Sequence, residues 1–196
     1  MKLSILSMMV CAALLIACCF AVFAFPGRAT AAEGAGAKKV LVTYFSWSGN
    51  TREIAGQIQE RTGGDLFEIK TVNAYPSDYR ECTDVAKKEQ NENARPALST
   101  TVENMGDYDV VFIGYPNWWG TIPMALFTFL EQYDFSGKTI VPFCTHEGSR
   151  LGRSVSDIEK LSPQATLLEG IAIRGSGVKS AGDDVAAWLQ SIGMTS

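Results

Sequence analysis

The sequence predicts an α/β fold in which helices cover both faces of a five-stranded parallel sheet. Strand-like and helix-like segments alternate five times after residue 38, and each connection between strands is long enough to hold a helix. The segment 109–115 is a nearly continuous apolar run, which is typical of a strand buried on both faces. Ligands bind such sheets beyond the carboxyl ends of the strands, so a site is expected at that edge.

The first strand–helix unit has clear start and stop signals. An apolar run predicts the first strand at Val40–Phe45. The first helix is predicted at 52–62, where the apolar residues share one face and Gly63 marks the end. The second strand is expected at 65–70, and its partly alternating polarity indicates an edge strand.

The stretch between the second and third strands is the least regular part of the chain. Ser77 is expected to cap a polar helix that extends to about Asn93, with Pro96 beyond its end. The central strand follows at 109–115. This crossover therefore also carries a helix, as a parallel connection requires.

The remaining elements follow from apolar patterns of helical or strand period. They are expected as helix 124–133, strand 139–144, helix 151–161, strand 166–173 and helix 178–192. With the two earlier units, they complete an α/β domain that spans residues 38–196.

Residues 1–31 are typical of a secretory signal rather than of a folded domain. Lys2 precedes an apolar run that extends to Phe25, and Ala29-Thr30-Ala31 has the small residues of a cleavage site. We expect cleavage after Ala31. Residues 32–37 are then a short linker of small residues before the domain.

Two other readings of this N-terminal segment stay open. The apolar run is close to the length that spans a bilayer, so the segment could remain as an uncleaved anchor. Leu15-Ile16-Ala17 before Cys18 also resembles a lipoprotein signal, in which Cys18 would carry lipid. In each reading the domain acts outside the cytoplasm, in the periplasm or another extracytoplasmic compartment.

Charge and cysteine content exclude some classes of protein. Removal of residues 1–31 takes away Lys2 and Arg28 but no acid, so 15 basic and 21 acidic residues remain, a formal charge of −6. This balance argues against nucleic acid as a partner. Only Cys82 and Cys144 remain, and we expect both to be free thiols rather than a bridge or a metal site.

The turn after the first strand has the composition of a phosphate-binding turn. Residues 46–51 supply three hydroxyl groups, an amide side chain and a glycine at the start of a helix. Free N–H groups and the helix dipole can bind a phosphate there without a cationic side chain. Gly49 would let the ligand approach, and Asn50 or Thr51 could cap the helix. The alternative is an ordinary polar turn, since these residues are common in turns.

Two further loops follow strands that end at the same edge of the sheet. One carries Trp118 and Trp119 between Pro116 and Gly120, and the other is the polar stretch 145–149. Aromatic side chains beside a phosphate clamp favour a phosphorylated, planar ligand. The alternative is that the two tryptophans only pack against the following helix.

These motifs together resemble the flavodoxin family, and more closely its flavodoxin-like branch with a Trp-Trp-Gly flavin loop. The resemblance covers essentially all of residues 38–193. The residues that carry it are the turn 46–51, the loop 114–123, the stretch 135–138 and the stretch 75–79.

The resemblance implies a flavodoxin-like three-layer sandwich, with a five-stranded parallel sheet of order 2-1-3-4-5, and a non-covalently bound FMN. By resemblance, the phosphate would be held by Ser46, Trp47, Ser48, Gly49, Asn50 and Thr51. The isoalloxazine would be flanked by Pro116, Asn117, Trp118, Trp119 and Gly120, and bordered on its pyrimidine side by Thr145, His146, Glu147 and Gly148.

The third loop departs from the glycine-rich sequence of many relatives. Glu147 is expected to place a carboxylate near the flavin N1. Its negative charge would disfavour the anionic hydroquinone and lower the potential of its formation. His146 is the only histidine of the chain, and it could tune the flavin or donate protons, or simply face solvent.

The favoured function is an FMN-binding electron-transfer protein that acts outside the cytoplasm. Its partners would be redox proteins or small quinone-like acceptors, with the membrane involved only through an uncleaved N-terminal segment. One alternative is an FMN-dependent NAD(P)H:quinone-type reductase, and another is a flavin-free binding module on the same fold. A response-regulator receiver is excluded, because Phe45-Ser46 and Tyr115-Pro116 stand where acidic residues are needed.

Overall fold

The computed structural model describes residues 38–195, and the predicted signal peptide or anchor and the whole linker lie outside this range. The predicted architecture is confirmed: a parallel sheet has the order β2-β1-β3-β4-β5, and a sixth short strand also pairs with β4. The strands are β1 (Val40–Tyr44), β2 (Asp65–Glu68), β3 (Val110–Pro116), β4 (Thr139–His146), β5 (Thr166–Leu167) and β6 (Ile171–Arg174).

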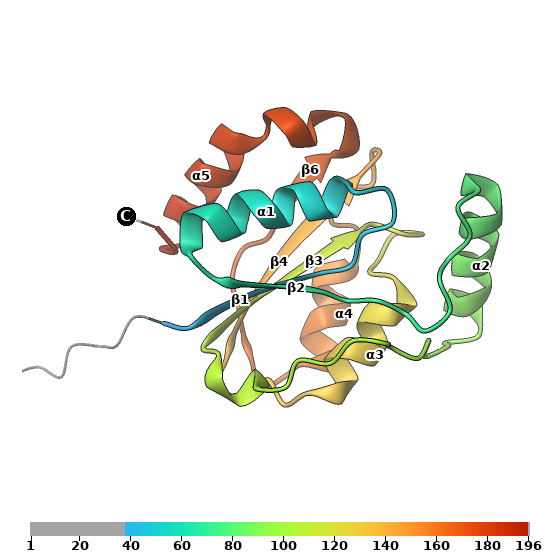
Figure 1. Cartoon of the computed structure of the whole chain (residues 1–196), viewed down its shortest axis with the longest axis horizontal. Coiled ribbons are helices and arrows are strands. Elements are labelled where there is room, and N and C mark those ends of the chain that lie inside the picture. Colours follow the sequence, from blue (N-terminus) through green and yellow to red (C-terminus); the bar gives the residue numbers. More distant parts are fainter. Residues whose placement is uncertain (1–37, 196) are drawn as a thin grey trace, which may run out of the picture. The chain divides into compact units, whose positions relative to one another are not determined.

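Helices cover both faces of the sheet (Figure 1). On one face lie α1 (Asn50–Thr62) and α5 (Gly182–Ser191), and on the other lie α3 (Met124–Gln132) and α4 (Ser154–Leu161). Two 3-10 turns, η1 (Met105–Asp107) and η2 (Gly175–Ser180), complete the secondary structure together with α2 (Tyr79–Asn91).

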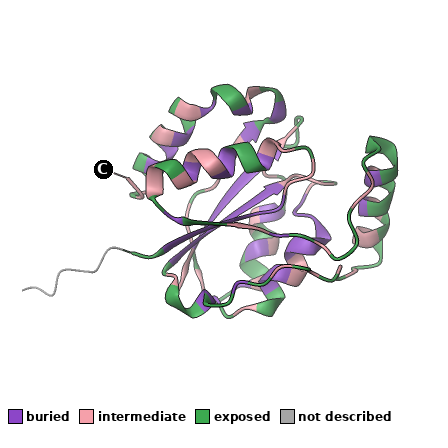
Figure 2. Ribbon diagram, in the orientation of Figure 1, coloured by how far each residue is buried: buried purple, intermediate pink, exposed green. Residues whose placement is uncertain are grey.

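The core consists of two apolar layers, one on each side of the sheet (Figure 2). Alternate residues of the strands serve the two layers, as the pleat of a strand requires. In β3, Val111 and Ile113 pack toward α3 and α4, while Val110 and Phe112 pack toward α1 and α5. This two-sided burial fixes the register of the central strands and thereby the position of the loops at their carboxyl ends.

The last strand differs from the prediction of one continuous strand at 166–173. It is divided into β5 and β6, because three residues lie between Leu167 and Ile171 opposite two residues of β4. Pro142 of β4 lies in this interval, and it has no N–H group to donate to a neighbouring strand. The interruption is thus a bulge beside a proline.

Several helix boundaries also differ from the predictions. Helix α1 begins at Asn50 rather than residue 52, and α4 begins at Ser154 rather than residue 151. The predicted cap at Ser77 is wrong, because the side chain of Asp78 accepts the bond from the Glu81 N–H at 2.9 Å. The predicted C-terminal helix at 178–192 is divided into the turn η2 and the shorter helix α5.

Helix α2 does not cover either face of the sheet. It lies beyond the carboxyl ends of the strands, at the right of Figure 1. Cys82 and Ala86 are its buried residues, and the rest of the helix is exposed or half-buried. The crossover between β2 and β3 therefore places its helix beside the edge where ligands bind in this class of sheet.

Cys82 and Cys144 are free, as expected, and both side chains are buried. Burial raises the pKa of the Cys82 thiol to about 11 and that of Cys144 to about 12, so both are protonated at neutral pH. Among the helices of residues 38–195, none is long and apolar enough to cross a bilayer.

Candidate functional site

The turn between β1 and α1 is closed by its own residues. The Oγ atom of Ser46 accepts hydrogen bonds from the backbone N–H groups of Gly49 and Arg52, at 3.2 and 3.3 Å. Gly49 has a φ of 93°, a left-handed conformation that favours glycine, and it is the N-cap residue of α1. The expectation that Asn50 or Thr51 caps the helix is wrong, since the N-cap residue is Gly49, which has no side chain to accept a bond.

This turn leaves donors free at the start of α1. Helix geometry gives the first N–H groups no acceptor within the helix, and Ser46 satisfies that of Arg52, so those of Asn50 and Thr51 remain. A methyl group on Gly49 would meet no described atom within 4 Å, so the backbone is open to a ligand. The Arg52 guanidinium is bound to the carboxylate of Glu68 on β2. The turn can therefore bind an anion through backbone groups and the helix dipole.

A pair of buried hydroxyl groups connects the first and third predicted loops. The Oγ1 atoms of Thr51 and Thr145 lie 2.8 Å apart and form a hydrogen bond, although 94 residues separate them in the sequence. Both side chains are buried, at 1% and 3% exposure. Thr145 and His146 also belong to β4 rather than to a loop, because they pair with Ile173 and Arg174 of β6. The hydroxyl pair thus anchors α1 to the end of β4.

The Trp-Trp-Gly segment forms a tight two-residue turn. The N–H of Trp118 bonds to the carbonyl of Thr121 at 2.9 Å, and the N–H of Thr121 bonds back to Trp118 at 3.1 Å. Trp119 and Gly120 occupy the centre with φ values of 51° and 84°. Two positive φ values define a type I′ turn. A bulky residue rarely adopts this conformation, so other contacts must hold Trp119 in place.

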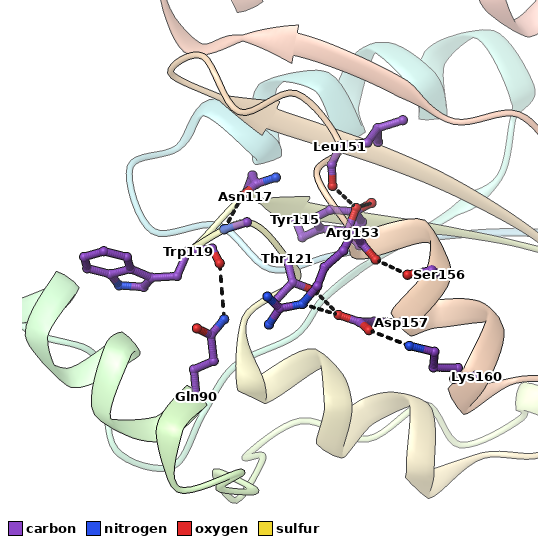
Figure 3. A network of polar contacts seen from close by, with 12 residues as sticks. Gln90, Tyr115, Asn117, Trp119, Thr121, Leu151, Arg153, Ser156, Asp157 and Lys160 are labelled. Carbon is purple, nitrogen blue, oxygen red and sulfur yellow. Dashed lines mark hydrogen bonds and ion pairs between the residues drawn. The ribbon is translucent and has the colours of Figure 1, made fainter.

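These contacts come from the segment that leads into α4 (Figure 3). The Asn117 side chain accepts a bond from the Gly120 N–H at 3.0 Å and donates to the Arg150 carbonyl at 2.7 Å. The Arg153 N–H bonds to the carbonyl of Gly120 at 2.9 Å. The Thr121 hydroxyl donates to Asp157 at 2.6 Å. The second loop and the segment that leads into α4 are therefore one packed unit.

The buried hydroxyl of Tyr115 connects the end of β3 to the start of α4 and so also supports this unit. It lies 2.7 Å from the Oγ of Ser154 at the start of α4. Burial raises the pKa of Tyr115 well above its usual value, so the phenol stays neutral. The Asn117 N–H also bonds to the Thr145 carbonyl at 2.8 Å, which extends the pairing of β3 and β4 by one step. The turn is thus supported by β4 as well as by α4.

The two tryptophans have different environments. Trp118 is half-buried and packs edge-to-face against Phe45 and Tyr75, with ring centroids 5.5 and 5.0 Å away. Trp119 is 50% exposed and projects over α2 (Figure 3). Packing against the core therefore accounts for Trp118 in part, whereas Trp119 presents its ring at the surface.

His146 and Glu147 lie at the end of β4 next to β6. The Nδ1 atom of His146 accepts a bond from the Gly148 N–H at 2.9 Å, which requires the neutral ring. Burial lowers the pKa of His146, and the charges of Arg150 and Arg174 lower it further. The Glu147 carboxylate is exposed and lies 4.0 Å from the Arg174 guanidinium, and its Oε1 approaches Gly175 next to the Asn50 amide.

The segment that leads into α2 has no predicted site role, but it contacts the first two loops. The indole N–H of Trp47 donates to the Pro76 carbonyl at 2.8 Å, and that of Trp119 donates to the Thr83 carbonyl at 3.0 Å. The Tyr75 hydroxyl donates to Glu89 at 2.7 Å. In the sequence, the aromatic residues of the stretch 75–79 were the feature that could have predicted this connection. Residues from all three predicted loops and from α2 therefore meet at one edge.

Metal chemistry has no support in the described part of the chain. Within residues 38–195, histidine, cysteine, aspartate and glutamate side chains form no group that could hold a metal ion. The arrangement instead offers backbone donors for an anion next to aromatic rings, which is the chemistry of a phosphorylated aromatic ligand.

Comparison with known proteins identifies the family. A family model described as Flavodoxin matches residues 39–192, and the chain therefore belongs to the flavodoxin family. A solved structure of a candidate flavoprotein from Bacteroides eggerthii is 37% identical, covers 79% of this chain and 98% of its own, and has a TM-score of 0.71. A flavoprotein from Lactobacillus acidophilus in complex with FMN is 26% identical, covers 76% of this chain and 99% of its own, and has a TM-score of 0.60.

Another relative carries the name of an enzyme. The NAD(P)H dehydrogenase (quinone) of Sinorhizobium fredii is 32% identical over 96 residues, which are 48% of this chain. The match spans 46% of the length of that relative. The fold and family are therefore those of a flavoprotein, and the similarity to the dehydrogenase covers about half of each protein.

Proposed function

We propose that this protein binds FMN and transfers electrons, and that it acts outside the cytoplasm. The observation that carries the proposal is the meeting of an anion-binding turn and an aromatic turn at one edge of the sheet. The Thr51–Thr145 hydroxyl pair and the Asn117–Thr145 backbone bond hold the loops together. The FMN complex of the L. acidophilus flavoprotein supports this choice of cofactor.

The residues present fit an FMN molecule. The free N–H groups of Asn50 and Thr51 and the open backbone at Gly49 suit a phosphate dianion. In this proposal Trp118 flanks the ring, and Thr145, His146, Glu147 and Gly148 border it on the other side. Bound FMN would supply reversible electron and hydride transfer, and the protein would supply binding and electrostatics.

The chain's own residues would control the environment of the ring. The edge-to-face packing of Tyr75 and Phe45 fixes the orientation of Trp118. The bond from Gly148 keeps the Nδ1 atom of His146 unprotonated. We further propose that Glu147 lowers the potential for forming the anionic hydroquinone, although Arg174 at 4.0 Å offsets part of its charge. An unchanged potential in Glu147→Gln would contradict this role.

The first test is the visible absorption spectrum of the purified protein before and after FMN is added and the excess removed. Retained flavin bands with quenched flavin fluorescence are the expected result. A protein that stays colourless would contradict FMN binding and would favour the flavin-free binding module. Thr51 is a poor target for a binding variant because its side chain is buried against Thr145, whereas Ser48 is exposed.

A second candidate function is an FMN-dependent NAD(P)H:quinone-type reductase. The similarity to the S. fredii dehydrogenase favours it. Rapid oxidation of NADH or NADPH by the FMN-loaded protein, with a quinone as acceptor, would establish this activity. No nicotinamide oxidation would favour an electron carrier that exchanges electrons with redox proteins or small quinone-like acceptors.

The proposal of export rests on the sequence of residues 1–31. Expression with the native N-terminus followed by cell fractionation and N-terminal sequencing tests it. A soluble extracytoplasmic product that begins at Ala32 is expected. A product in the cytoplasm that still begins with residue 1 would contradict it, and a membrane fraction would favour an anchor or lipidated Cys18. Nucleic acid has no place in this proposal, since the predicted mature chain is acidic.

A further inference from the structure

Helix α2 bridges the first and second loops of the candidate site. Near its start, Pro76 accepts the indole N–H of Trp47, and within the helix, Thr83 accepts that of Trp119. Gln90 donates to the Trp119 carbonyl at 3.4 Å. The helix is displaced from both faces of the sheet and lies beyond the carboxyl ends of the strands (Figure 1). It therefore forms a wall of the candidate site rather than a cover for the core.

One side of this helix lines up with aromatic rings. Tyr79, Thr83, Lys87 and Gln90 follow a helical spacing of three to four residues and lie on one face. Tyr79 is 70% exposed, and its ring centroid lies 6.2 Å from that of Trp47. Thr83, Lys87 and Gln90 each contact Trp119. This face of α2 therefore lies along aromatic rings, from Trp47 in the phosphate turn to Trp119 in the Trp-Trp-Gly turn.

The ring of Trp119 is fixed in place but only partly covered. Its N–H is bound to Thr83, and the Lys87 ammonium lies 5.2 Å from the ring centroid over one face. The side chain is still 50% exposed. The backbone holds φ at 51°, a conformation unfavourable for tryptophan that the surrounding contacts maintain. Because these contacts hold the half-exposed indole, its ring face opposite Lys87 can serve as a stacking surface that loses little side-chain entropy on binding.

The charge of α2 indicates the kind of ligand that fits this surface. The helix carries Arg80, Lys87 and Lys88 against Glu81, Asp84 and Glu89, so its net formal charge is zero. A dinucleotide or a strongly charged protein surface would find no complementary field there. A small, uncharged, planar aromatic molecule needs none, and the Lys87 ammonium can face its carbonyl oxygens.

We propose that Trp119 and the adjoining face of α2 form a subsite for a planar, uncharged electron acceptor of the quinone class, which stacks on the free face of the indole. This inference rests on the proposed FMN-binding function, because the acceptor is useful only next to a bound flavin. Trp119 then serves acceptor binding, whereas the phosphate turn serves flavin binding.

The test uses the FMN-loaded, oxidised protein and 1,4-naphthoquinone, a pair that cannot exchange electrons. FMN affinity of the wild type is measured first, and a failure there would overturn the proposed function itself. Naphthoquinone is then titrated while the indole N–H signals of the four tryptophans are followed by NMR. A saturable shift of the Trp119 signal, assigned with Trp119→Phe, is expected, together with a smaller shift of the other indoles.

The variants separate acceptor binding from flavin binding. Trp119→Ala is expected to weaken naphthoquinone binding about three- to tenfold, as the loss of one stacked aromatic pair predicts, and to change FMN affinity less than about threefold. Trp119→Phe should retain most of the quinone affinity. Val85→Ala is the matched control, because Val85 is an exposed α2 residue on the opposite side of the helix and should behave as the wild type.

Three results would overturn the inference. One is the absence of any saturable shift of the Trp119 signal. Another is unchanged naphthoquinone affinity in Trp119→Ala. The third is a loss of FMN affinity in Trp119→Ala that matches the loss of quinone affinity, which would assign Trp119 to the flavin instead.

Discussion

Two turns at the carboxyl edge of the sheet both contain residues with positive φ, but they are held in different ways. In the turn 46–49, the left-handed residue is Gly49, and the Ser46 hydroxyl three residues earlier closes the turn. In the turn 118–121, the first left-handed residue is Trp119, and its supports are Thr83, Arg150 and Arg153 on distant segments. The first turn is closed by its own hydroxyl, with a further long-range bond from Trp47 to Pro76, whereas the second depends throughout on the packed tertiary structure.

This difference suggests a division of roles. A locally closed turn can present the same N–H groups whether or not the neighbouring loops move, which suits a permanent phosphate clamp. A turn that is held by α2, β4 and α4 responds to each of them, which suits the end of the site that meets a changing partner. Four experiments test this difference between the two turns.

The largest effect is expected from a negative charge in the phosphate turn. Ser48→Asp should weaken FMN binding by at least about a hundredfold, since like charges a few ångströms apart near a protein surface repel by several kcal/mol. Ser48→Asn has nearly the same shape without the charge and should stay within about fivefold of the wild type. Fluorescence titration of FMN measures both. Equal losses in the two variants would mean that the effect is steric and not electrostatic.

The second prediction compares the stability lost when the side chain that closes each turn is removed. Asn117→Ala removes bonds to Gly120 and Arg150 and should lower the free energy of unfolding by about 2 kcal/mol. Ser46→Ala removes two longer bonds within one turn and should cost about 1 kcal/mol or less. Urea unfolding of the FMN-free protein gives both values. A larger loss in Ser46→Ala would reverse the comparison.

A smaller effect is expected from the hydroxyl pair that links the two regions. Thr51→Val leaves the buried Thr145 hydroxyl without its partner and should destabilise the protein by about 1–2 kcal/mol. The double variant Thr51→Val/Thr145→Val should be more stable than the sum of the single losses predicts, with a coupling of about 1 kcal/mol. Strict additivity in urea unfolding would show that the hydroxyls do not interact.

The smallest effect concerns protonation of His146. Burial and the charges of Arg150 and Arg174 hold its pKa below the ordinary value of 6.5. The unfolded chain therefore takes up this proton at a higher pH than the folded protein does. The contribution of the neutral ring to stability is fully present above pH 6.5. It decreases as the pH falls below 6.5 toward the lower pKa of the folded protein. NMR titration of this single histidine should give a value below 6.5, and Arg150→Gln should raise it. A value at or above 6.5 would contradict the arrangement at Gly148.

The amino-acid pattern alone was enough to predict the fold and the edge of the sheet where the site lies. Apolar runs of strand period, separated by helical patterns, predicted the order of elements and the parallel sheet, because burial on two faces leaves a strong periodic signal. The turn 46–51 was also readable, since glycine and hydroxyl side chains near the start of a helix have local preferences.

How the loops meet follows from contacts in the folded protein and could not be predicted from the sequence. The Thr51–Thr145 pair joins residues 94 apart, and the type I′ turn at Trp119 depends on Asn117, Arg150 and α2. The position of α2 beyond the strand ends, and the bulge next to Pro142, likewise left no periodic signal. These features depend on contacts between distant segments, whose energies exceed local preferences of a few tenths of a kcal/mol per residue, and such contacts exist only once the chain has folded.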